Sequence, residues 1–291
     1  MTTDPVALAR SLDLPGIADV HTHFLPEEVM RKVWRIFDDA GRLYGVDWPI
    51  AYRLPEAERV GLLREWGVRR FTALVYAHRP GMAHWLNTWA AEFSQANPDC
   101  LTTATFFPEP EAVEYVEAAL AAGARVFKIH LQVSGFDPRD SSLKPVWGLV
   151  EDAAVPVVLH CGSGPIPGRF TGPGPVRELL RSHPRLQLVI AHAGAPEYGD
   201  FLALSEQFEG VRIDTTMVFT DFMERLAPFP AELRPRLLAA TLRNDVLFGS
   251  DFPNISYDYG HALAALVRLD LDEDPEWLRR ILWHAAAELF A

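Results

Sequence analysis

Eight short runs of β-branched and aromatic residues recur along the chain, and segments with helical periodicity lie between them. Most of these runs are too short to be helices and lack polar alternation, which is typical of parallel strands covered on both faces. The predicted strands are 17–20, 71–76, 101–107, 125–131, 155–160, 186–192, 211–215 and 245–250. Strands that alternate with helices predict an α/β fold, either a (β/α)8 barrel or a doubly wound sheet.

The helical segments support this order. Val113, Val116 and Leu120 share one face of a helix predicted over 110–122, which starts with a proline and stops before a glycine. Further helices are predicted over 56–66, 82–96, 201–208 and 275–290. Because the strand count is eight and no GxGxxG segment follows the first strand, we expect a (β/α)8 TIM barrel.

The segment 24–55 is too long for an ordinary loop between the first strand and the next helix. Its large aromatic residues include Trp34, Tyr44, Trp48 and Tyr52. Two interpretations are open: an insertion after the first strand that folds over the top of the barrel, which we favour, or a peripheral helix on its outside. No low-complexity linker or composition shift divides the chain, so we expect one barrel domain over 17–291 after an N-terminal arm over 1–16.

Composition excludes several classes of protein. The 291 residues contain 27 Lys and Arg against 39 Asp and Glu, a net charge of −12 that argues against nucleic-acid and anionic-membrane partners. No apolar run approaches the ~20 residues that span a bilayer, and the N-terminal sequence lacks the pattern of a secretory signal. Two cysteines cannot form a disulfide framework. We therefore expect a cytoplasmic protein whose partner is a small-molecule substrate.

Residues that bind metals or transfer protons stand at the ends of several predicted strands. In chain order they are His21 and His23, Lys128 and His130, His160, His192, and Asp251. The carboxyl ends of barrel strands meet on one face, where active sites form. We therefore expect these side chains to converge, although they are far apart in the sequence.

The HxH pair is the centre of this pattern. His21 and His23 are two residues apart, so their side chains lie on the same face of a strand. An isolated HxH is weak evidence, but histidines at two later strand ends, His160 and His192, and the final Asp251 make it far more specific. Three neutral imidazoles and a carboxylate suit Zn²⁺, Fe²⁺ or Mn²⁺, and imidazole favours zinc.

Four segments, IADVHTHFLPEE, VVLHCGSG, VIAHAGAPEY and LFGSDFPN, resemble the amidohydrolase superfamily. The similarity is greatest to its amidohydrolase-related branch, which includes relatives of aminocarboxymuconate-semialdehyde decarboxylase, and it covers nearly all of the chain. The resemblance implies a (β/α)8 barrel with a divalent metal ion. It implies that His21, His23, His160 and Asp251 are the metal ligands, and that His192 touches the bound water or the substrate.

The resemblance also bears on the number of metal ions. Binuclear members bridge two ions with a carbamylated lysine on the fourth strand, and Lys128 lies near that position. The decarboxylase-like branch generally works with one metal and no ligand there, so one ion is favoured. Lys128 would then be either a cation that faces the substrate or a structural lysine bonded to strand carbonyls. Barrels of this family are often dimers, which suggests a homodimer.

The loop 162–175 is rich in glycine and proline and follows the strand that ends at His160. Its Arg169 is either an anion contact or a solvated surface residue. Lys128, His130 and Arg169 together would suit a substrate that carries a carboxylate. Cys161 follows His160 directly, so alternation turns it away from the site and predicts a buried, inert thiol.

These residues support two reactions. With a metal-activated water, Asp251 can accept and return a proton while His192 polarises a carbonyl, which gives hydrolysis of an amide, ester or lactone. The same groups could support non-oxidative decarboxylation of a small unsaturated or aromatic acid. We expect a hydrolase first, because water activation is the more common use of such a set. A catalytically inactive barrel that binds a ligand is the third alternative.

Overall fold

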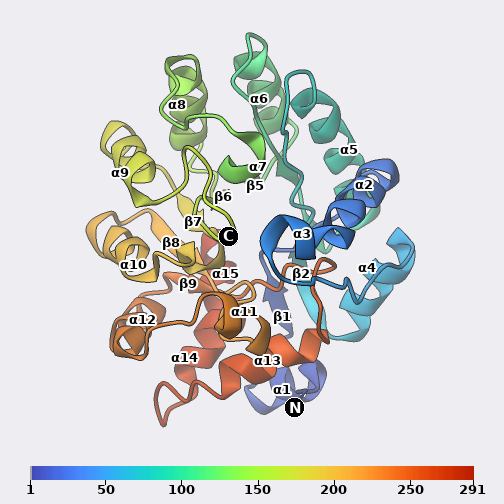
Figure 1. The fold of residues 1–291 in the computed structure, drawn as a ribbon, viewed down its shortest axis with the longest axis vertical. Helices are drawn as coiled ribbons and strands as arrows, with labels where there is room; N and C mark the ends of the chain where they lie inside the picture. Colours follow the sequence, from blue (N-terminus) through green and yellow to red (C-terminus); the bar gives the residue numbers. More distant parts are fainter. Residues whose placement is uncertain (1) are drawn as a thin grey trace. The chain divides into compact units, whose positions relative to one another are not determined.

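The computed structural model describes residues 2–291 (Figure 1), and the chain's internal contacts divide it into two compact units. The first unit joins the described residues up to Thr72 with Thr215–Ala291, and the second is Ala73–Asp214. No helix in residues 2–291 is long and apolar enough to cross a membrane.

Within Ala73–Asp214, consecutive strands pair in parallel. They are β4 (Thr103–Ala104), β5 (Val126–His130), β6 (Val157–His160), β7 (Leu188–Ile190) and β8 (Val211–Asp214). The apolar residues of these strands are fully buried, as predicted for strands covered on both faces. Phe106 after β4 packs edge-on against Trp147, with ring centroids 4.8 Å apart, and both side chains are fully buried.

Helices separate these strands and lie along their outer side (Figure 1). The longer ones are α5 (Ala83–Ala96), α6 (Ala112–Ala121), α8 (Lys144–Asp152), α9 (Pro173–Ser182) and α10 (Tyr198–Gln207). Shorter elements are β3 (Cys100–Leu101), α7 (Leu131–Ser134), η1 (Ser141–Leu143) and η2 (Ala191–Gly194). The helices predicted over 82–96, 110–122 and 201–208 are confirmed, with ends displaced by up to three residues.

In the first unit, β1 (Ile17–Asp19) pairs in parallel with β2 (Val68–Thr72). The Val20 amide donates to Phe248 O at 3.0 Å, so the chain after β1 lies beside the chain after β9 (Val246–Leu247). The helices are α1 (Pro5–Ser11), α4 (Glu56–Glu65), α11 (Asp221–Leu226), α12 (Arg234–Leu242) and α13 (Tyr259–Val267), with the turn η3 (Ala231–Leu233). The helix predicted over 275–290 is confirmed as α14 (Glu276–Arg279), the π-helical turn η4 (Arg280–His284) and α15 (Ala285–Leu289).

The segment 24–55 contains two helices, α2 (Glu27–Asp38) and α3 (Ala40–Tyr44), followed by an irregular stretch. Its buried residues Trp48 and Ile50 join an apolar cluster with Phe222 and Ile255 of the same unit. The Trp48 ring lies 4.7 Å from the Phe222 ring. The segment therefore packs against α11 and against the chain that follows β9.

Some strands begin and end at residues other than those predicted. The second runs over Val68–Thr72 rather than 71–76, and the third is divided into β3 and β4. Beyond Thr72, the Ala73 and Ala77 amides donate to the hydroxyls of Thr103 and Thr105, both at 3.3 Å. Side-chain oxygens thus replace strand carbonyls as acceptors, which ends the regular ladder although the segment stays buried.

Close packing at Gly249 gives a first prediction. A β-carbon there would lie 2.1 Å from Thr216 Oγ1 and 2.6 Å from His21 Cβ. We expect Gly249→Ala to lower the free energy of unfolding by about 1–3 kcal/mol, because the β1 end has no room to move. Gly148→Ala, in α8 with nothing within 4 Å of the new carbon, should instead raise it by up to about 1 kcal/mol. Denaturant unfolding measures both, and a stable Gly249→Ala variant would contradict the packing at His21.

Candidate metal centre and histidine cluster

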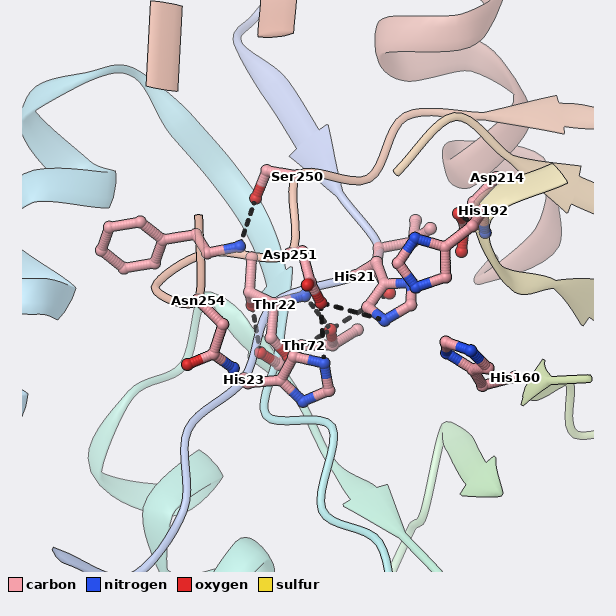
Figure 2. Close-up of polar contacts among 12 residues, drawn as sticks. His21, Thr22, His23, Thr72, His160, His192, Asp214, Ser250, Asp251 and Asn254 are labelled. Carbon is pink, nitrogen blue, oxygen red and sulfur yellow. Dashed lines mark hydrogen bonds and ion pairs between the residues drawn. The ribbon is translucent and has the colours of Figure 1, made fainter. Parts of the chain in front are cut away.

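Three buried side chains of the first unit form a group with the geometry of a metal site (Figure 2): His21, His23 and Asp251. One ligand atom from each lies within 4.8 Å of the others. Asp251 Oδ1 is 3.1 Å from His23 Nε2 and 3.6 Å from His21 Nε2. The imidazoles meet edge to face, with centroids 5.2 Å apart. Each residue is at most 8% exposed, so this small polar group is largely shielded from water.

Backbone hydrogen bonds fix these three residues relative to one another. The Asp251 amide donates to His21 O at 2.8 Å, and the His23 amide donates to Phe252 O at 2.7 Å. Asp251 has φ +70°, a left-handed conformation that costs a non-glycine residue about 1–3 kcal/mol unless its surroundings impose it. These hydrogen bonds therefore hold the ligand-bearing segments together without an ion.

Thr22, between the two histidines, is bonded to the end of β2. Its amide donates to Thr72 Oγ1 at 3.2 Å, and its hydroxyl donates to Thr72 O. Thr72 Oγ1 in turn donates to Val20 O at 3.1 Å. The residue between the two histidines is thus anchored at the end of β2, and the imidazoles on either side keep a fixed separation.

Sequence reasoning missed Asp19, whose carboxylate is 1% exposed. It accepts hydrogen bonds from the His21 amide at 3.2 Å, the Ser250 amide at 3.1 Å and the Tyr259 hydroxyl at 3.0 Å. Burial raises the pKa of Asp19 to about 7, although these hydrogen bonds act in the opposite direction. The signal for it was present, because Asp19 stands two residues before His21 and shares its strand face.

The second unit contains a separate cluster of histidine rings. His130 and His160 end the neighbouring strands β5 and β6 in register, and their rings stack at 3.9 Å with an interplanar angle of 11°. The His192 ring, just after β7, lies 4.7 Å from the His160 ring, and the Tyr76 ring lies 5.3 Å from the His130 ring. The predicted convergence of these strand ends is confirmed within this unit.

His192 depends on an unusual turn. His192, Ala193 and Gly194 all have positive φ, and a β-carbon on Gly194 would overlap the Phe201 ring at 2.0 Å. The His192 amide donates to Asp214 Oδ1 at 2.8 Å, and Figure 2 shows the two residues together. Asp214 therefore supports His192 through its backbone.

The other predicted residues of this unit have the following positions. Lys128 lies within β5 and is fully buried. Arg169 is exposed on the loop before α9, with its guanidinium 5.1 Å from the Phe170 ring. Cys161 is fully buried, and burial raises the pKa of its thiol above the ordinary range, as expected for an inert cysteine. The structure thus brings His21, His23 and Asp251 together in one unit and places the other five predicted site residues, Lys128, His130, His160, Arg169 and His192, in the second.

Comparison with known proteins identifies the family. The amidohydrolase family model matches residues 18–291. The chain belongs to the amidohydrolase family. No protein of curated function matches the sequence.

Solved structures establish the fold of this amidohydrolase as an α/β TIM barrel. An uncharacterized TIM-barrel protein from Bordetella bronchiseptica matches 94% of this chain over 97% of its own, with a TM-score of 0.68 and 18% identity. A probable 2-pyrone-4,6-dicarboxylic acid hydrolase from Acinetobacter baumannii has a TM-score of 0.60 at 17% identity, over 94% and 98% of the chains. 5-Carboxyvanillate decarboxylase from Sphingomonas paucimobilis has a TM-score of 0.59 at 15% identity, over 94% and 98%. The predicted barrel is confirmed.

The donor set of the amidohydrolase fits a divalent cation. Two imidazole nitrogens and one carboxylate oxygen face one another in a buried space, and this combination of ligands is usual for zinc and related ions. A carboxylate that is shielded from water also needs a positive partner. His21, His23 and Asp251 could therefore hold such an ion.

We predict that a His21→Ala, His23→Ala double variant, purified without chelator, contains far less divalent metal than the wild type. Metal analysis of the purified proteins measures this. Added Zn²⁺ should raise the free energy of unfolding of metal-depleted wild type by about 2.7 kcal/mol at 100 times its Kd, and should not stabilise the variant. His84→Ala, an exposed histidine of α5, is the control. Equal metal content in the double variant and the wild type would contradict the assignment.

Proposed function

We propose that this amidohydrolase is a metal-dependent hydrolase of a small carbonyl compound, an amide, ester or lactone that carries a carboxylate. The buried group of His21, His23 and Asp251 is the observation on which the proposal depends. In the proposed site, these residues hold one divalent ion, with zinc favoured by the imidazole ligands. When bound, such an ion acidifies a water molecule and polarises a carbonyl oxygen, which provides a nucleophile near neutral pH.

The proposed proton transfers belong to Asp251 and His192. Asp251 accepts a proton from the attacking water and returns it to the leaving group, a role that contributes about 10²–10⁴-fold to rate. Its backbone is fixed by the hydrogen bond from its amide to His21 O, so the carboxylate needs little reorganisation. His192, held through its amide by Asp214, orients the water or the substrate carbonyl.

The carboxylate of the substrate is proposed to meet Lys128, His130 and Arg169. Lys128 is fully buried, and a buried cation is less costly when an anion accompanies it. The partly exposed His130 lies at the end of the same strand. The likeness to a probable hydrolase of 2-pyrone-4,6-dicarboxylic acid supports a carboxylate-bearing lactone as one substrate class to test.

The second candidate is a metal-dependent, non-oxidative decarboxylase of a small unsaturated or aromatic acid. The likeness to 5-carboxyvanillate decarboxylase favours it. The two reactions differ in their balance. Hydrolysis breaks a carbon–oxygen or carbon–nitrogen bond, adding OH from water to the carbonyl carbon and the remaining proton to the leaving oxygen or nitrogen. Decarboxylation breaks a carbon–carbon bond, releases CO₂ and places a proton on the carbon that loses it.

A panel of lactones and unsaturated or aromatic carboxylic acids, assayed in oxygen-18 water, distinguishes the two reactions. We expect product carboxylates that contain the label, without release of CO₂, because the proposed nucleophile is water. The metal-loaded wild-type chain is the sample and the metal-depleted chain is its control. Metal-dependent release of CO₂ with unlabelled product would assign the chain as a decarboxylase instead.

We further predict that Asp251→Asn lowers kcat/KM for the active substrate by about 10²–10⁴-fold, because the amide cannot accept the proton. Metal content must be measured beside activity, since Asp251 is also a proposed ligand. Asp152→Asn, an exposed carboxylate at the end of α8, should leave the rate unchanged. An Asp251→Asn variant with metal bound and full activity would remove Asp251 from the mechanism.

A further inference from the structure

Two tryptophans of the segment 24–55 donate hydrogen bonds to Asn254 of the loop that carries Asp251. Figure 2 shows Asn254 close to Asp251 and His23. The indole Nε1 of Trp48 donates to the backbone oxygen of Asn254 at 2.8 Å. The indole Nε1 of Trp34 donates to the side-chain Oδ1 of the same residue at 3.2 Å. Asn254 is 4% exposed, so little water competes for either bond.

Asn254 is joined to Asp251 by a tight turn. The Asn254 amide donates to Asp251 O at 2.8 Å, and the Asp251 amide donates to His21 O at the same distance. The turn is therefore held by His21 at its start and by the two tryptophans at its end. One residue further on, the Ala51 amide donates to Ile255 O at 2.9 Å, which adds a backbone bond from the same segment.

This turn needs support from outside. Asp251 has φ +70°, and a non-glycine residue keeps that conformation only where surrounding contacts impose it. Trp48 is a rigid support, because its ring lies 5.2 Å from the Phe37 ring and 4.7 Å from the Phe222 ring. A buried indole N–H also requires an acceptor, which favours one position of the Asn254 carbonyl over others.

We propose that Trp34 and Trp48 are positioning residues, which hold the Asp251 carboxylate in metal-binding geometry through Asn254. The inference rests on the proposed role of Asp251 as a metal ligand. Under this inference the segment 24–55 contributes to metal affinity, although its two indoles bond to Asn254 and not to the Asp251 carboxylate. Loss of such outer hydrogen bonds typically lowers metal affinity by about 10–100-fold.

Trp48→Phe and Trp34→Phe, singly and together, test the inference because they keep an aromatic ring and remove only the N–H donor. Affinity for Co²⁺ is measured by chelator competition, the visible absorption of bound Co²⁺ reports coordination geometry, and denaturant unfolding of the metal-free proteins reports stability. We expect the double variant to bind Co²⁺ about 10–100-fold more weakly and to show an altered Co²⁺ spectrum.

Leu237→Ala is the matched control, because it removes buried packing in α12 and leaves both indole donors and the rings around Trp48 in place. We expect it to lower stability while the affinity and the Co²⁺ spectrum stay close to those of the wild type. Trp85→Phe, on the exposed face of α5, controls for loss of an indole elsewhere. If Trp48→Phe does not fold, Trp34→Phe alone tests the inference, since Trp34 is only partly buried.

The outcomes separate the inference from the proposed function. A wild-type chain that does not bind Co²⁺ overturns the proposed metal site and, with it, the inference. A wild type that binds Co²⁺ while the double variant matches its affinity and spectrum overturns the inference alone. The inference also fails if Leu237→Ala reduces affinity as much as the double variant at a similar loss of stability.

Discussion

The carboxylate of Asp19 is the interaction on which the ligand group of the first unit depends. A carboxylate removed from water is costly unless donors surround it, and the donors to Asp19 include the amides of His21 and Ser250 and the hydroxyl of Tyr259. The first two donors belong to the chain segments that carry the candidate ligands. One buried side chain therefore sets the spacing between the β1 end and the β9 end, and the positions of His21 and Asp251 follow from it.

The second unit positions its histidines by other means. His130 and His160 are partners in adjacent parallel strands, so strand register alone places their rings face to face. His192 lies beyond its strand in a left-handed turn, which the Asp214 carboxylate supports through the His192 amide. Register is robust, because a one-residue slip would move every side chain of the strand to the opposite face of the sheet.

Much of the site could be predicted because its signals are local. The two-residue period of a strand places His21 and His23 on one face, and parallel topology brings strand ends together. The supports could not be predicted, since Tyr259 and Asp19 are 240 residues apart and Trp34 and Asn254 are 220 apart. The prediction of the second strand over 71–76 was wrong for a similar reason. No local sequence pattern indicates which backbone amides bond to threonine hydroxyls instead of strand carbonyls.

The choice between hydrolysis and decarboxylation depends on the direction of one proton transfer. Water activation needs a base beside the attacking oxygen, whereas decarboxylation needs an acid that can reach the carbon losing CO₂. Asp251 is held by its backbone at 3.1 Å from His23 Nε2 and 3.6 Å from His21 Nε2, so its carboxylate is directed at the ligand group. A carboxylate with that orientation is better placed to act as a base at the centre than as an acid at a distant carbon. A decarboxylase would have to supply its acid from a residue other than Asp251.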